Sequence, residues 1–164
     1  MNHDQRDEAM RLTLDHVRRV AFLMSECIYN LLQRAIFHDE SKFSFDEWES
    51  VVEVTKNLHA MSYGSVEYEK QLKILDKWIK LHYSRNSHHP QFYKNGIDGM
   101  DLLDLIEMIA DWKAATERHT DGNLLKSFNV NREKFNISPQ LENILKNTAI
   151  RMGWMDAPIV SAQE

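Results

Sequence analysis

The apolar positions of this chain recur at helical spacing over most of its length. Between about Gln5 and Phe37 they form one stripe in steps of three and four residues, through Leu12, His16, Val20, Leu23, Cys27, Leu31 and Ala35. That spacing predicts a single amphipathic helix with no internal stop signal. A second strong pattern runs from Met100 to about Arg118. Its leucines and isoleucines lie on more than one side of a helix, so we expect this helix to run through the centre of the fold.

Capping and turn signals predict the other elements. Ser44, followed three residues later by Glu47, matches a capping box for a helix to about Leu58. Further signals predict a turn at 63–65, a helix over 66–83, a loop over 84–99, a short helix capped by Asn123, and a helix from Ser138-Pro139 to about Gly153. The chain therefore predicts an all-α domain of about six or seven helices over residues 1–154, followed by a weakly patterned tail at 155–164.

The amino-acid composition supports the all-α class and excludes some classes of binding partner. The 164 residues include only five Gly and three Pro, which favours helices over a turn-rich fold. A formal charge of −5 offers no basic footprint for duplex nucleic acid. No apolar run approaches the ~20 residues of a membrane span, and the N-terminus is too polar for a signal peptide. One cysteine, Cys27, excludes an internal disulfide, so we expect a cytoplasmic protein.

Metal-binding residue types gather in the middle of the sequence. His38-Asp39 closes the first apolar stripe, and His82, the pair His88-His89 and Asp111 follow. Imidazoles together with carboxylates suit Zn, Mn, Fe, Co or Ni, and one carboxylate can bridge two ions. We therefore expect one or two divalent ions held by His38, Asp39, His82, His88, His89 and Asp111.

The surroundings of these residues sharpen the prediction. Asp104, Glu107 and Asp111 are spaced three and four apart, so they share one face of the expected central helix. A carboxylate among apolar neighbours has to be paired or bind a cation, which favours Asp111 as a ligand. Pro90 stiffens the His88-His89 loop. Adjacent histidines rarely bind one ion together, so His89 is a candidate either for the metal or for the substrate.

Basic residues near the His-Asp pair are candidates for phosphate recognition. Lys42 follows Asp39 by three residues, close enough to neutralise a phosphate oxygen or a carboxylate beside the metal. Arg85 and Arg34 are weaker candidates for binding the substrate. The alternative for each is a solvated surface charge.

These motifs resemble the HD-domain superfamily of metal-dependent phosphohydrolases over about residues 12–115. His16-Val17-Arg18-Arg19-Val20-Ala21 is similar to its first element, and His38-Asp39-Glu40-Ser41-Lys42 to its His-Asp-x-x-Lys variant. The stretch from His88-His89 to Asp111 is similar to the third block of HD-type dinucleoside tetraphosphate hydrolases and HD-GYP phosphodiesterases. The chain also resembles small HD-like proteins of phage and bacterial genomes. The resemblance implies His16 as a further metal ligand.

Two features depart from the family pattern. No Gly-Tyr-Pro follows His88-His89, which argues against a cyclic-dinucleotide substrate. Only 22 residues separate His16 from His38, and a continuous helix would hold them about 33 Å apart. Three alternatives remain: the helix breaks near Ser25–Asn30, His16 acts across a subunit interface, or His16 is not a ligand.

Three functions fit the sequence. The first is hydrolysis of a nucleotide or dinucleotide phosphate ester or anhydride by a metal-activated water, with Asp39 and Lys42 in the reaction centre. The second is a di-iron oxygenase on the same type of scaffold. The third is a non-catalytic helical module for binding or inhibition.

The length of the first helix predicts an assembly. A helix of about 30 residues is about 45 Å long and would overhang a globule of this size. Because its apolar stripe needs a partner, we expect a homodimer.

Overall fold

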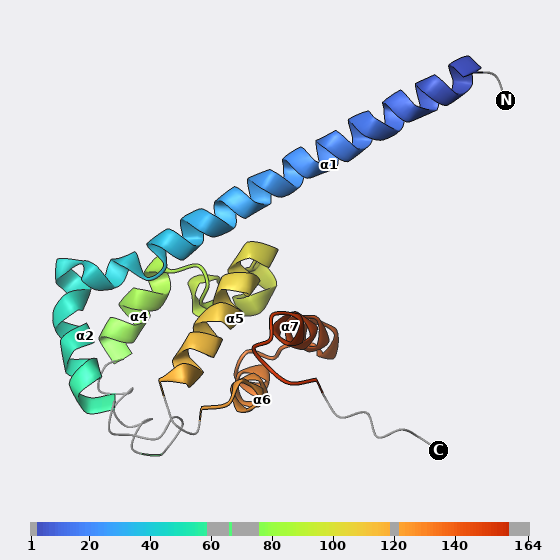
Figure 1. Cartoon of the computed structure of the whole chain (residues 1–164). Helices are drawn as coiled ribbons and strands as arrows, with labels where there is room; N and C mark the ends of the chain where they lie inside the picture. Colours follow the sequence, from blue (N-terminus) through green and yellow to red (C-terminus); the bar gives the residue numbers. More distant parts are fainter. Residues whose placement is uncertain (1–2, 59–65, 67–75, 119–121, 158–164) are drawn as a thin grey trace, which may run out of the picture. The chain divides into compact units, whose positions relative to one another are not determined.

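The computed structural model describes residues 3–58, 66, 76–118 and 122–157, and all regular structure within them is helical (Figure 1). The predicted all-α class is confirmed. The α-helices of these residues are α1 (His3–Phe37), α2 (Phe45–Leu58), α4 (Asp76–Arg85), α5 (Leu102–Glu117), α6 (Leu124–Lys134) and α7 (Pro139–Arg151). The short 3-10 helices are η1 (Glu40–Phe43), η2 (Pro90–Phe92) and η3 (Gly96–Gly99).

The chain divides into two compact units, Met1–His38 and Asp39–Glu164. The first unit consists of α1, a 35-residue helix none of whose residues is buried. Its bounds confirm the helix expected from about Gln5 to Phe37. The segment predicted as one domain over 1–154 therefore contains two units, and the hydrophobic core belongs to the second.

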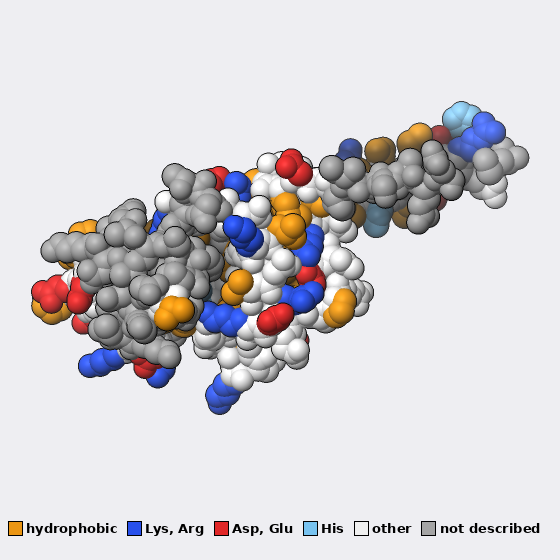
Figure 2. All heavy atoms as spheres, turned by 90° about the horizontal axis from the view of Figure 1, so that it is seen from below, with side chains coloured by type: hydrophobic (Ala, Val, Ile, Leu, Met, Phe, Trp, Pro, Cys, Tyr) orange, Lys and Arg blue, Asp and Glu red, His pale blue; other side chains and the backbone are white. Residues whose placement is uncertain are grey.

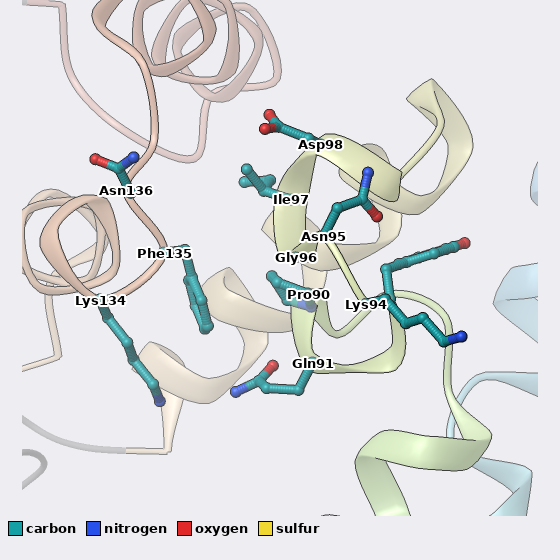
Figure 3. A pocket seen from close by; sticks show the side chains of 11 residues that line it. Pro90, Gln91, Lys94, Asn95, Gly96, Ile97, Asp98, Lys134, Phe135 and Asn136 are labelled. Carbon is teal, nitrogen blue, oxygen red and sulfur yellow. The ribbon is translucent and has the colours of Figure 1, made fainter.

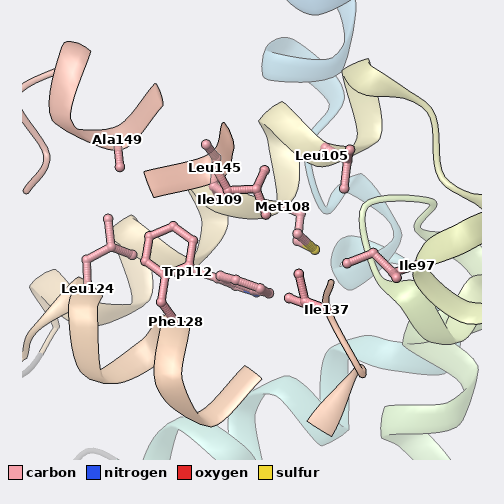
Figure 4. Packing of buried hydrophobic residues seen from close by; sticks show 10 residues of the cluster. All are labelled: Ile97, Leu105, Met108, Ile109, Trp112, Leu124, Phe128, Ile137, Leu145 and Ala149. Carbon is pink, nitrogen blue, oxygen red and sulfur yellow. The ribbon is translucent and has the colours of Figure 1, made fainter. Parts of the chain in front are cut away.

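Helix α5 provides the centre of the second unit and packs against α6 and α7. Figure 4 shows the buried cluster that these three helices and their connections build, namely Ile97, Leu105, Met108, Ile109, Trp112, Leu124, Phe128, Ile137, Leu145 and Ala149. Trp112 meets Phe128 edge to face, with ring centroids 5.8 Å apart. Each large side chain buried in this way stabilises the fold by roughly 1.5–3 kcal/mol. The expectation that the Met100–Arg118 segment lies at the centre is correct.

Side-chain caps fix where the helices of the second unit begin. Asn123 and Ser138 cap α6 and α7 as predicted, each accepting hydrogen bonds from backbone N–H groups of the first turn. The sequence did not reveal the capping box of α5, which Asp101 and Asp104 form together. After α7 the chain turns at Gly153, whose φ of 69° suits glycine. Met155 still packs against the core, so the ordered structure continues into the predicted tail.

Helices α2 and α4 pack against each other beside η1. Helix α2 begins directly after Ser44, as predicted. The expected turn at 63–65 and most of the first half of the helix expected over 66–83 lie outside the described residues. The described part of that second helix is α4, which runs on to Arg85.

The surface of the second unit is mixed in charge on the face seen in Figure 2. Lys and Arg side chains alternate there with Asp and Glu, and hydrophobic side chains appear as separate small groups. None of the described helices is long and apolar enough to cross a bilayer.

Candidate metal centre

Four predicted ligands from separate parts of the second unit meet at one place. Asp39 lies just before η1, His82 lies on α4, and His88 and His89 form the turn before η2. Each offers a ligand atom, and these atoms all lie within 4.8 Å of one another. A second pair, Asp39 and Asp111, also has carboxylate oxygens within 4.8 Å. The structure thus brings together five of the predicted ligands.

The Nε2 atoms of His82 and His88 face the same carboxylate, and that of His89 lies beside the first of them. Nε2 of His82 lies 3.2 Å from Oδ1 of Asp39, and Nε2 of His88 lies 3.5 Å from that oxygen. Nε2 of His89 lies 3.1 Å from Nε2 of His82. Three rings therefore present their outer nitrogens to one small volume.

A buried carboxylate, that of Glu47, and a half-buried one, that of Glu107, lie behind two of these rings. Nδ1 of His82 is 3.0 Å from Oε2 of Glu47, and Nδ1 of His88 is 3.1 Å from Oε1 of Glu107. An ionised carboxylate only accepts hydrogen bonds, so each Nδ1 donates a hydrogen bond to its carboxylate. In the neutral ring this places the lone pair on Nε2, the nitrogen that faces Asp39. Such carboxylate–histidine pairs are typical of metal ligands in proteins.

Glu47 owes its position to the packing of α2 on α4. Its side chain is fully buried, and its second oxygen accepts a hydrogen bond of 3.2 Å from Arg85. Arg85 also binds Asp46 and Ser44. The sequence predicted Glu47 as a capping residue and Arg85 as a phosphate ligand. In the structure both side chains are engaged with each other, because a buried carboxylate needs a cation beside it.

The acidic face of α5 has three distinct roles. Asp104 is fully buried and holds the preceding loop, Glu107 binds His88, and Asp111 lies beside Asp39. The i, i+3, i+7 spacing predicted that the three would share a face. The structure confirms that the three share a face. Asp104 holds the loop, Glu107 contacts the candidate ligand His88, and Asp111 lies in the cluster itself.

Asp104 fastens both ends of the loop that carries the paired histidines. Its carboxylate accepts a hydrogen bond of 2.7 Å from Oγ of Ser87 and one of 2.6 Å from the hydroxyl of Tyr93. Burial, together with the hydrogen bond to Asp104, raises the pKa of Tyr93 to about 12. Gly99 permits this packing, since a Cβ there would lie 2.7 Å from Cβ of Tyr93. The loop is therefore held rigidly on α5.

Asp39 adopts a left-handed backbone conformation, with φ 57° and ψ 20°. Aspartate tolerates this region, but at a cost in free energy, and such conformations cluster at functional sites. Lys42 stabilises the arrangement, because its ammonium group pairs with Oδ2 of Asp39 and its backbone N–H bonds to the Asp39 carbonyl at 2.9 Å. The predicted proximity of Lys42 to Asp39 is confirmed.

His89 is held in its neutral form. Burial is the main cause that lowers its pKa to about 3, and the neighbouring His88 and His82 act in the same direction. Asp111 and Asp39 oppose the shift. A neutral imidazole is the form that binds metals.

The two remaining predicted ligands belong to the first unit. His16 lies within α1, which is continuous from His3 to Phe37, so the helix does not break near Ser25–Asn30. Within one chain His16 and His38 are consequently about 33 Å apart and do not share an ion. His38 follows the last residue of α1 and directly precedes Asp39 in the chain; it stays a predicted ligand.

A surface hollow of about 540 Å³ lies next to the paired histidines in sequence, beginning at Pro90 (Figure 3). Pro90, Ile97 and Phe135 are its least exposed hydrophobic side chains. The other residues that line it are Gln91, Tyr93, Lys94, Asn95, Gly96, Asp98, Lys134 and Asn136. None of these belongs to the five clustered ligands.

The donor spacing fits a first-row transition metal. Two ligands at about 2.0–2.2 Å from one ion, at tetrahedral or octahedral angles, are separated by roughly 3.0–3.6 Å. The observed separations of 3.1, 3.2 and 3.5 Å fall in this range. Because the rings direct lone pairs toward a carboxylate, a shared cation would also relieve the repulsion between acceptors.

A family model with the description "Family of unknown function (DUF5662)" matches residues 5–151. The chain belongs to this family. The matched region covers most of both units and contains every candidate ligand. No curated protein and no solved structure matches the chain.

Proposed function

We propose that the protein is a metal-dependent phosphohydrolase of the HD type, acting on a phosphate ester or anhydride of a nucleotide. The observation that carries the proposal is the cluster in which Nε2 of His82 and of His88 approach Asp39 and Nε2 of His89 lies beside Nε2 of His82, with Glu47 and Glu107 behind two of the rings. The resemblance of the His-Asp pair and the third block to HD phosphohydrolases supports the choice of reaction.

Two sets of residues would bind two ions. Asp39, His82, His88 and His89 would hold one ion, and Asp39 with Asp111 would hold a second. A divalent ion of the Mn, Fe, Co, Ni or Zn type supplies Lewis acidity, which lowers the pKa of water and polarises a phosphoryl oxygen. His38 is proposed as a further ligand on the resemblance alone.

Lys42 contributes positive charge at the same carboxylate. Its pairing with Asp39 orients that side chain. Lys42 is half-buried, and we assign it to the phosphoryl oxygens, where charge develops during hydrolysis. Arg85, with its bonds to Glu47 and Asp46, acts as a positioning residue instead.

Metal content and turnover test the proposal separately. Protein stripped with a chelator and reloaded with Mn, Fe, Co, Ni or Zn is analysed for metal per chain, then assayed on nucleotides for release of phosphate or mononucleotide. We expect metal to bind and to restore turnover. His88→Ala should lose metal, whereas Asp98→Asn, an exposed aspartate in the same loop region, should retain it.

Each failure has a distinct meaning. If no metal binds, the imidazoles and carboxylates form only a buried polar network, and the proposal of a metal centre is wrong. If metal binds but no phosphate ester or anhydride is hydrolysed, the metal centre stands and the proposed reaction is wrong. Iron in the purified protein with oxygen consumption would identify the oxygenase alternative.

A further inference from the structure

Helix α1 has one face that is apolar at every position of a heptad repeat. Counting from Met10 in steps of four and three residues, the positions are Met10, Leu14, Val17, Ala21, Met24, Ile28, Leu31 and Ala35. All eight are apolar, over nearly four heptads. A repeat of this length is typical of a coiled coil.

This seam is exposed in the chain. None of the residues of α1 is buried, and Met10, Val17, Met24 and Ile28 are each more than half exposed. Isolated helices gain little from their intrinsic propensity, and most helical stability comes from packing of the apolar face. A helix of 35 residues with such a seam therefore requires a partner helix.

From the seam we infer that two copies of this chain associate through α1 as an antiparallel coiled coil. An antiparallel pair of identical helices matches a with d positions, and the eight seam positions then match completely with none left over. The layers pair Met10 with Ala35, Leu14 with Leu31, Val17 with Ile28, and Ala21 with Met24. The seam extends for about 39 Å.

Side-chain volume favours this orientation over a parallel one. The antiparallel layers place each alanine opposite a methionine, and pair similar residues elsewhere, so every layer has a comparable volume. A parallel pair would instead place Ala21 against Ala21 and Met24 against Met24. Layers of small side-chain volume would then alternate with layers of large volume. Well-packed cores tolerate neither voids nor overpacking.

The charged residues that flank the seam also favour the antiparallel orientation. In a parallel pair Arg6 of one helix would lie beside Arg11 of the other, which is repulsive. In the antiparallel pair Arg11 lies across from Leu32 and Arg18 from Ser25, so no like charges meet. Arg11 is in addition paired within its own helix to Glu8 and Asp15.

Two leucines of one turn give a matched test of the seam. Leu14 lies on the seam, whereas Leu12, which belongs to the stripe from Gln5 to Phe37 but not to the heptad positions, lies on the opposite side of the helix; both are exposed, at 44% and 55%. Light scattering and sedimentation should show a dimer at micromolar concentration. Leu14→Glu should weaken association at least 100-fold, and Leu12→Glu less than 3-fold. A monomeric wild type, or equal effects of the two substitutions, would overturn the inference.

A cysteine pair tests the orientation. In a Cys27→Ser background, Leu14→Cys combined with Leu31→Cys should form a disulfide-linked dimer under mild oxidation. Leu14→Cys alone should remain uncrosslinked, because antiparallel helices hold the two copies of residue 14 about 25 Å apart along the axis. Efficient linkage of Leu14→Cys alone would show a parallel pair. All four tryptophans lie beyond residue 39, so their near-ultraviolet circular dichroism confirms that the second unit stays folded in each variant.

Discussion

Glu47 lies 3.0 Å from Nδ1 of His82 and is fully buried. This contact orients the ring of His82 so that Nε2 faces Asp39. We expect Glu47→Gln to lower metal affinity by about 10–100-fold, the usual effect of removing a carboxylate behind a ligating histidine. Equilibrium dialysis with metal analysis measures the change. Glu49→Gln, an exposed residue on the same helix, should leave affinity unchanged; equal losses in the two variants would count against the role of Glu47.

The sequence predicted the candidate ligands that cluster in the structure better than it predicted the carboxylates behind them. His82, His88, His89, Asp39 and Asp111 stood out because their residue types suit metals and their flanks are apolar. Glu47 stood out only as a capping residue, and Glu107 only as part of the acidic face of the central helix. A carboxylate three residues after Ser44 matches a capping box equally well, and only the packing of α2 on α4 turns it toward His82.

Ion pairs between residues far apart in the chain could also not be predicted from the sequence. Arg85 was predicted to bind phosphate because its charge was visible and its partners on α2 were not. By contrast α1 and α5 were predicted well, since a long periodic stripe specifies a helix locally. The sequence does not specify the division of the chain into two units at His38, because the stripe on α1 is the same wherever its partner lies.

Asp104 should be essential for the loop that carries His88 and His89. Asp104→Asn weakens the buried, charge-assisted hydrogen bonds to Ser87 and Tyr93, and we expect it to lower the free energy of unfolding by about 1.5–3 kcal/mol. Metal content should fall with it. Urea denaturation measures the first effect. The exposed Asp98→Asn provides the control, and a stability of Asp104→Asn equal to that of the control would refute the fastening role.

Removal of metal should destabilise the folded protein. The candidate ligands come from the segment before η1, from α4 and from the turn before η2, so an ion would hold these segments together. A ligand at 100 times its Kd stabilises the native state by about 2.7 kcal/mol. Chelation should therefore lower the Tm, and readdition of metal should restore it. His88→Ala should show the lower Tm without any response to chelator.

His16 should be dispensable for metal binding within one chain. Helix α1 is continuous, which keeps His16 about 33 Å from His38 along the helix. We expect His16→Ala to retain the metal content of the wild type. Loss of metal in this variant would support the remaining alternative, in which His16 acts across a subunit interface. Mixing His16→Ala with Asp39→Ala subunits would then restore part of the metal content.

Tyr93 should make stability sensitive to alkaline pH. Its pKa in the folded protein is about 12, against an ordinary value of 10.0. The folded state thus holds the phenolic proton more tightly than the unfolded state does, so the contribution of Tyr93 is fully present below pH 10 and is lost as the pH rises toward 12. Urea denaturation at pH 8 to 11.5 should show a steeper decline for the wild type than for Tyr93→Phe, which carries no titrating hydroxyl. If the two curves stay parallel over this range, the hydrogen bond from Tyr93 to the buried carboxylate of Asp104 does not stabilise the loop.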